Sequence, residues 1–210
     1  MFMSSRLVSV ALVCVVLAVF CSGRDSAMDN INAAAAQGSS SWTQDSVRSG
    51  VYAVLVSGAL HHGLPGSRML VRDELIPIRA LSAATVPAFL KQFDSVPAEL
   101  RAALRQPTIK PPPLDRALFP AGTRFISPAS IAAAFTQRWA EEWQAFKRQY
   151  QSDGWVSFSD VAVTSDGLDA LVYAEAHCGN LCGQGSYIWL QRTGSAAPWS
   201  TMKTIVSWVS

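Results

Sequence analysis

The spacing of apolar residues in the C-terminal half predicts one long helix. In Ser127–Gln151 the bulky apolar residues recur every three or four positions, which is typical of one face of a helix. Ser127 or its neighbour can cap this helix, and Pro128 suits its first turn. The apolar positions are Ile131, Phe135, Trp139, Trp143, Phe146 and Tyr150. We therefore expect a single helix that carries an aromatic stripe.

Four β-rich segments follow the predicted helix and are joined by short connections, which favour antiparallel pairing of sequence neighbours. Asp166-Gly167, in the first connection, is typical of a tight hairpin turn because glycine accepts a positive φ. The segments are Gly154–Thr164, Leu168–His177, Gly185–Arg192 and Trp199–Val209. We expect a four-stranded antiparallel meander, with the aromatic helix packed across its apolar side chains. The meander offers Trp155, Phe158, Val172, Ile188 and Val206 for this contact.

The first part of the N-terminal half predicts a helix and a strand. Gln44–His62 is apolar at spacings of three and four, so we predict a helix with Asp45 at its cap. Arg68–Ile78 alternates imperfectly between apolar and polar residues, and Pro77 favours a place at the edge of a sheet.

The next part predicts two short helices and a connector. Thr85–Phe93 and Pro97–Leu104 each carry a proline near the start, as first helical turns allow. Gln106–Pro120 contains three consecutive prolines and is typical of an extended segment. The expected fold class is α+β, with the N-terminal helices and one edge strand added to the helix and meander.

The charge and length patterns divide the chain into three regions. Residues 1–23 have the order of a signal peptide: one positive charge, the apolar run Leu7–Cys21, then small residues. An uncleaved anchor is the alternative, although this run spans only about 22 Å of helix against a core of about 30 Å. Residues 24–43 are small and polar, as in a flexible linker. We expect residues 44–210 to form a single domain with a helical part (44–106), a Pro-rich connector (107–126), and the helix with its meander (127–210).

Two cysteines remain outside the predicted signal peptide, Cys178 and Cys182, at facing ends of a predicted hairpin. Directly opposite strand residues lie within disulfide reach, so a structural disulfide is the leading interpretation. Thiol redox chemistry is a second interpretation. Redox-active pairs usually have two residues between the cysteines, with the first cysteine at the N-terminus of a helix, whereas here three residues separate them and the flanking segments are β-rich. A metal site with His177 and either His61 or His62 is a third. Adjacent strand residues such as His177 and Cys178 point to opposite faces, which argues against it.

Other candidate chemistry is weak. A formal charge of +2 and scattered basic residues argue against nucleic acid as a partner. No G-x-S-x-G elbow is present, and Gly183-x-Gly185 lacks the rest of a dinucleotide fingerprint. The side chains of Glu141 and Glu142 would point about 100° apart on a helix, which argues against a joint role in acid/base catalysis and suits a solvent-exposed face. The pair Asp73 and Glu74 has no assigned role. We predict no cofactor and no metal, and no catalytic residue can be named.

The C-terminal part resembles a widespread set of uncharacterised exported bacterial proteins. The matching stretches are Trp143–Phe146, Tyr150–Val161 (YQSDGWVSFSDV), Ala170–Arg192 (ALVYAEAHCGNLCGQGSYIWLQR) and Trp208–Ser210 (WVS). Arg68–Ile78 is similar to an earlier strand of that set. Pro198-Trp199 departs from it, where a charged turn is usual. The resemblance implies an exported protein with this C-terminal fold, and it implies no activity.

These observations favour a non-enzymatic binding or interaction domain of the cell envelope, periplasmic or extracellular, stabilised by the hairpin disulfide. Its partner is expected to be a protein or a small molecule, with membrane contact only through an uncleaved N-terminal segment. An enzyme with scattered residues such as Asp73, Glu74 or His61 is the alternative. A purely structural envelope protein is a third hypothesis.

Overall fold

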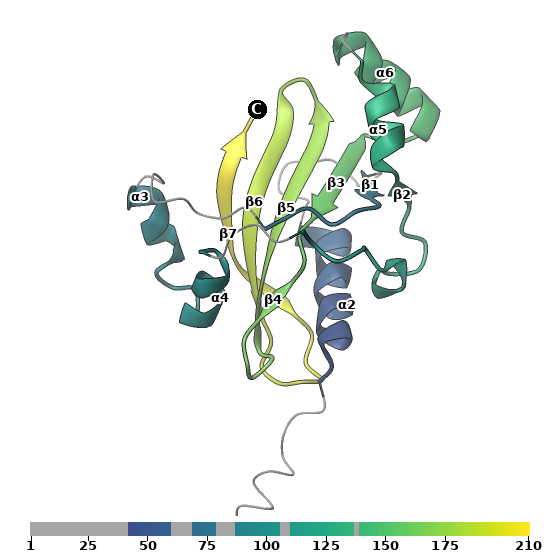
Figure 1. Ribbon diagram of the computed structural model, residues 1–210. Coiled ribbons are helices and arrows are strands. Elements are labelled where there is room, and N and C mark those ends of the chain that lie inside the picture. Colours follow the sequence, from purple (N-terminus) through teal and green to yellow (C-terminus); the bar gives the residue numbers. More distant parts are fainter. Residues whose placement is uncertain (1–41, 60–68, 79–86, 106–109, 137–138) are drawn as a thin grey trace, which may run out of the picture. The chain divides into compact units, whose positions relative to one another are not determined.

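The computed structural model describes residues 42–59, 69–78, 87–105, 110–136 and 139–210. They build a mixed sheet of seven strands in the order β2-β1-β3-β5-β6-β7, with β4 also paired to β5 (Figure 1). The predicted signal peptide, nearly all of the predicted linker, and His61 and His62 lie outside the described residues. The strands are β1 (Met69–Arg72), β2 (Phe125–Ile126), β3 (Gly154–Phe158), β4 (Ala162–Val163), β5 (Asp169–Gly179), β6 (Cys182–Gln191) and β7 (Ser200–Val209).

The long C-terminal strands confirm the predicted meander. β5 pairs antiparallel with β6, and β6 with β7. Tyr173 lies opposite Tyr187, so the apolar alternation of the two strands is in register. Gly167 has a φ of 71° in the turn before β5, which explains the Asp-Gly sequence there.

The first predicted β segment is divided, so that the sheet is not a simple four-stranded meander. β3 and β4 both pair antiparallel with β5, and Ser159 to Val161 lie between them. Asp160 in this interruption accepts two hydrogen bonds from Arg48, at 2.9 and 2.8 Å. The buried Ser159 stays attached to β5, because its hydroxyl oxygen accepts a hydrogen bond from Tyr173 N at 2.9 Å.

The prediction of an edge strand at Arg68–Ile78 was wrong in its placement. β1 pairs parallel with β3 on one side and with β2 on the other. The edge strand is β2, which lies at the end of the Pro-rich connector. The prolines of that segment predict an extended connector, so the sequence gives no signal for a strand there. Pro77 lies outside β1 and is exposed, so it constrains no ladder position.

One face of the sheet is covered by helix α2 (Gln44–Val54), which we call the α2 face. Val47, Val51 and Leu55 recur every four residues and are fully buried. They pack against the meander side chains that had been expected to receive the aromatic helix, among them Phe158, Val172 and Ile188. The cap of α2 is Thr43 and not Asp45, because Ser46 N donates to Thr43 Oγ1 at 3.2 Å.

The Pro-rich connector contributes to the same core. Phe119 is buried, and its ring stacks on Tyr52 with centroids 4.5 Å apart and planes inclined by 9°. Tyr52 donates a hydrogen bond to the carbonyl oxygen of Ser159 at 3.0 Å, and burial, followed by the charge of Asp160, raises its pKa. The extended segment therefore ties α2 to the sheet.

The prediction of one long helix was wrong. The structure has α5 (Pro128–Ala134) and α6 (Trp139–Tyr150), and Phe135 leaves the helical conformation at φ −125° and ψ 96°. On a continuous helix, Phe135 and Trp143 would be about 12 Å apart along the axis. Their ring centroids are 4.6 Å apart, so the break folds the stripe into a cluster. Glu142 holds the break, since its carboxylate accepts hydrogen bonds from Thr136 N and Oγ1 at 2.9 and 2.7 Å.

The two predicted short helices are confirmed. α3 (Pro87–Leu90) continues as a 3-10 turn to Phe93, and α4 (Ala98–Ala103) follows. They pack on the face opposite α2, where Phe93 meets Tyr187 edge-on with centroids 5.2 Å apart. The cluster of α5 and α6 packs around Trp155, which points to the same face because its neighbour Val156 packs in the core under α2. This face, which we call the aromatic face, therefore carries the two helix pairs around different strands.

Candidate functional site

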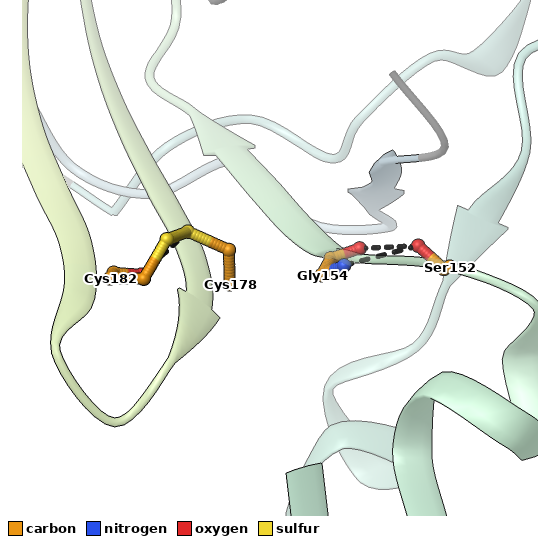
Figure 2. The surroundings of a disulfide bond; sticks show 4 residues. All are labelled: Ser152, Gly154, Cys178 and Cys182. Carbon is orange, nitrogen blue, oxygen red and sulfur yellow. Dashed lines mark hydrogen bonds between the residues drawn. A yellow bond between two sulfur atoms is a disulfide. The ribbon is translucent and has the colours of Figure 1, made fainter. Parts of the chain in front are cut away.

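The predicted disulfide is present at the tip of the β5–β6 hairpin. Cys178 and Cys182 are bonded, with Cα atoms 5.1 Å apart (Figure 2). The strand register shifts between His177 and Gly179, so Cys178 is the extra residue of an irregularity. Among the described residues no group of three or more His, Cys, Asp or Glu side chains is placed to hold a metal ion.

Loss of this disulfide should have a moderate effect on stability. In the double variant Cys178→Ala/Cys182→Ala we expect the free energy of unfolding to fall by about 2 kcal/mol, because the closed loop is short. Urea unfolding followed by tryptophan fluorescence measures it. The native protein treated with reductant is the control, and the two should agree. A loss above about 5 kcal/mol would mean that the bond does more than close this loop.

Strand β3 starts directly against the disulfide hairpin (Figure 2). A Cβ atom at Gly154 would overlap the carbonyl oxygen of His177 and lie 2.9 Å from Cys178 Cα. Both are main-chain atoms, so only glycine allows this approach. Ser152 Oγ supports the start of β3 by donating to Gly154 O at 2.7 Å. The close approach places Trp155 opposite His177 in the ladder.

Four aromatic side chains from three strands and α6 form a continuous stack. The Trp155 ring lies between Trp143 and His177, with centroid distances of 5.2 and 5.0 Å and interplanar angles of 12° and 20°. The indole of Trp208 extends the series, at 5.7 Å from the His177 ring. Because both faces of the Trp155 ring are covered, the residue is only 7% exposed.

The two glycines of β6 make room for Trp208. A Cβ at Gly185 would overlap Trp208 Nε1, and one at Gly183 would lie 3.0 Å from the far end of the same indole. Residues two apart on a strand share a face, so Gly183 and Gly185 leave a continuous bare strip under the ring. This clearance for Trp208 is the structural role of the Gly-x-Gly sequence.

Trp208 begins a chain of polar contacts that ends at His177. Its Nε1–H donates to Tyr173 Oη at 2.8 Å, and Tyr173 donates to Glu175 Oε1 at 2.9 Å. His177 Nε2 lies 3.7 Å from Glu175 Oε2, so the two form an ion pair whenever the imidazole is protonated. His177, and then the Tyr173 hydroxyl, hold the pKa of Glu175 below its ordinary value against the opposing effect of burial.

This contact predicts an acid-sensitive contribution to stability. Because the pKa of Glu175 is lower in the folded state, the unfolded state takes up its proton first as the pH falls below about 4.5. The contribution is therefore complete above that pH and is lost as the pH falls through the lower, folded value. Glu175→Gln should flatten this part of the curve, measured by urea unfolding between pH 3 and pH 6. An unchanged acid slope would contradict the assignment.

A pocket of about 740 Å³ lies beside the aromatic stack. One wall is apolar and comes from the α5–α6 cluster and from Trp155 of the stack. The other is polar and comes from His177, the disulfide loop and Ser210. The lining residues are Ile131, Ala132, Phe135, Trp143, Trp155, His177, Gly179, Asn180 and Ser210. A volume between 300 and 1,000 Å³ with aromatic walls and a few polar groups is typical of small-molecule sites.

The acidic pairs considered from the sequence lie in structural contacts. Asp73 pairs with Arg116, which lowers the pKa of that carboxyl, and Glu74 pairs with Arg72 at 2.7 Å. Glu142 closes the break between α5 and α6, and Glu141 is exposed on α6. None of these four carboxylates lines the pocket.

The pocket itself was missed, although part of its signal is in the sequence. Tyr173, Glu175 and His177 alternate along β5 and therefore share one face, together with Gly183 and Gly185 of β6. A strand face with one histidine, one carboxylate and two bare positions is unusual for a core. The contribution of Phe135 and Ala132 could not be found, since it depends on the break between the helices.

No protein-family model, curated protein or solved structure matches this chain. None of the helices in the described ranges has the length and apolar character needed to cross a bilayer.

Proposed function

We propose that this chain is a non-enzymatic binding domain that holds a small, largely apolar ligand in the pocket beside the aromatic stack. The observation that carries the proposal is the pocket of about 740 Å³ between the α5–α6 cluster and the disulfide hairpin. Its apolar wall supplies burial for a ligand, and its polar wall supplies orientation.

The site is held in shape before a ligand arrives. Gly179 and Asn180 line the pocket and lie inside the loop that the disulfide closes. His177 is fixed between two indole rings. A preorganised wall reduces the ordering entropy that binding must overcome.

We also propose that the protein works outside the cytoplasm, in the periplasm or beyond the cell. The Cys178–Cys182 bond supports this, because disulfides persist in oxidising compartments. The apolar run Leu7–Cys21 after a basic start supports it independently. Cells that express the full chain should contain it in the exported fraction, with Cys178 and Cys182 resistant to alkylation before reduction. Recovery in the cytoplasm with Cys178 and Cys182 both alkylated would overturn the proposal.

A neutral fluorescent probe tests the binding site. N-phenyl-1-naphthylamine should gain fluorescence with the native protein and be displaced by n-octanol. Ala132→Trp should abolish the signal, because Ala132 is an exposed residue of α5 that lines the pocket. Ala133→Trp is the matched control, since Ala133 is exposed on the same helix and does not line the pocket. Equal binding by both variants, or none by the native protein, would contradict the proposal.

A second candidate is an enzyme that uses His177 for proton transfer. The contact that favours it is Glu175 Oε2 at 3.7 Å from His177 Nε2, because a carboxylate beside an imidazole is a common arrangement in general acid–base catalysis. A bound compound that is recovered chemically altered, with the change abolished in His177→Gln, would favour this candidate over simple binding.

A further inference from the structure

The polar wall of the pocket has an unusual charge pattern. Within the described ranges, the pocket lining includes no lysine, arginine, aspartate or glutamate, and His177 is its only ionisable side chain. A pocket built for a carboxylate or a phosphate normally presents an arginine, a lysine or a helix N-terminus to the anion. Of the lysines and arginines that the structure describes, none lines this pocket.

A fixed negative charge lies directly behind His177. Trp208 Nε1–H can only donate, so Tyr173 Oη accepts its hydrogen bond and must give its own proton to Glu175. Glu175 is thereby kept as an acceptor, and its other oxygen faces His177. When the imidazole is neutral, this part of the wall is negative. When it is protonated, Glu175 already balances its charge.

We propose that the pocket selects amphipathic ligands whose polar end is neutral or cationic, and that it rejects carboxylates of the same size and shape. This inference rests on the proposed function, because it concerns the same pocket. The apolar body of the ligand lies against the α5–α6 cluster, and its polar end meets His177 and Asn180. Glu175 would repel a ligand carboxylate there, and no described lysine or arginine lines the pocket to offset that repulsion.

Three compounds with one eight-carbon chain separate charge from shape: n-octanol, n-octylammonium and octanoate. Each is titrated into the disulfide-intact protein at pH 7.5, and binding is followed by the indole N–H signals in ¹H–¹⁵N spectra. Octanol and octylammonium should bind, and octanoate should bind at least about tenfold more weakly than octylammonium. Octanoate binding as tight as octylammonium would overturn the inference.

Variants identify the source of the discrimination. Glu175→Gln should bring the octylammonium and octanoate affinities within about threefold of each other. Glu99→Gln removes a carboxylate that binds Ser165, ahead of β5 at the end away from His177, and should leave the ratio unchanged. Failure of all three compounds to bind the native protein would refute the binding pocket itself. Binding of all three with equal affinity would leave the pocket standing and refute only the charge selection.

Discussion

Gly154→Ala should destabilise the fold by about 3 kcal/mol, a large effect for the addition of one methyl group. The new Cβ would overlap the carbonyl oxygen of His177 and crowd Cys178 Cα. Since both are main-chain atoms held by the disulfide hairpin, no side-chain rotation relieves the contact. The start of β3 must move, and Trp155 with it. Urea unfolding of the purified variant measures the loss, and the midpoint should fall with little change in slope.

Gly194→Ala is the matched control for this substitution. A Cβ there would meet no atom within 4 Å, and the residue does not have a positive φ. Its effect should stay within about 0.5 kcal/mol. If the two alanine variants were equally stable, the close approach of β3 to the hairpin would be absent from the protein in solution.

Local patterns were sufficient to predict the elements whose partners are near in the sequence. The β5–β6 hairpin and its disulfide follow from alternation, a short turn and two facing cysteines, all within Ala170–Arg192. The short helices α3 and α4 follow from their prolines and apolar spacing. In these cases the residues that form the element also carry the information that specifies it.

The predictions that failed concern partners distant in the sequence. The predicted contact of the aromatic stripe with Trp155 is confirmed. The predicted contact with Val172 is wrong, because α2 covers that face and Val51 packs with Val172 in its core. Both helices have an apolar face of the right period, so periodicity alone cannot choose between them. The break at Phe135 is decided by tertiary contact, because it brings that ring to within 5.4 Å of Trp155. Such packing outweighs the small propensity difference between continuing and ending a helix.

The candidate site depends on the same long-range contacts, which is why residue spacing alone does not reveal it. Its aromatic wall joins α5, α6 and β3, and its polar wall joins β5 and the disulfide loop. Trp155 belongs to both systems, since it packs in the α5–α6 cluster and stacks on His177. Stability and binding should therefore fail together when this one ring is removed.

Trp155→Ala should reduce the free energy of unfolding by about 3–5 kcal/mol, because it empties the centre of a buried aromatic cluster. It should also abolish binding of N-phenyl-1-naphthylamine, since His177 loses the ring that holds it in plane. Trp155→Phe should retain most of the stability and bind the probe more weakly. Met202→Ala, at a half-exposed position of β7, serves as the control and should change neither property.

Measurements on these variants separate the two roles of the ring. Stability is measured by urea unfolding. Binding is measured without urea, at a temperature where circular dichroism shows that each variant is folded. A folded Trp155→Ala protein that binds the probe like the native one would place the ligand elsewhere. A loss of stability below about 1 kcal/mol would contradict the stacked arrangement, because deleting a ring enclosed by Trp143 and His177 should lower the free energy of unfolding by more than this.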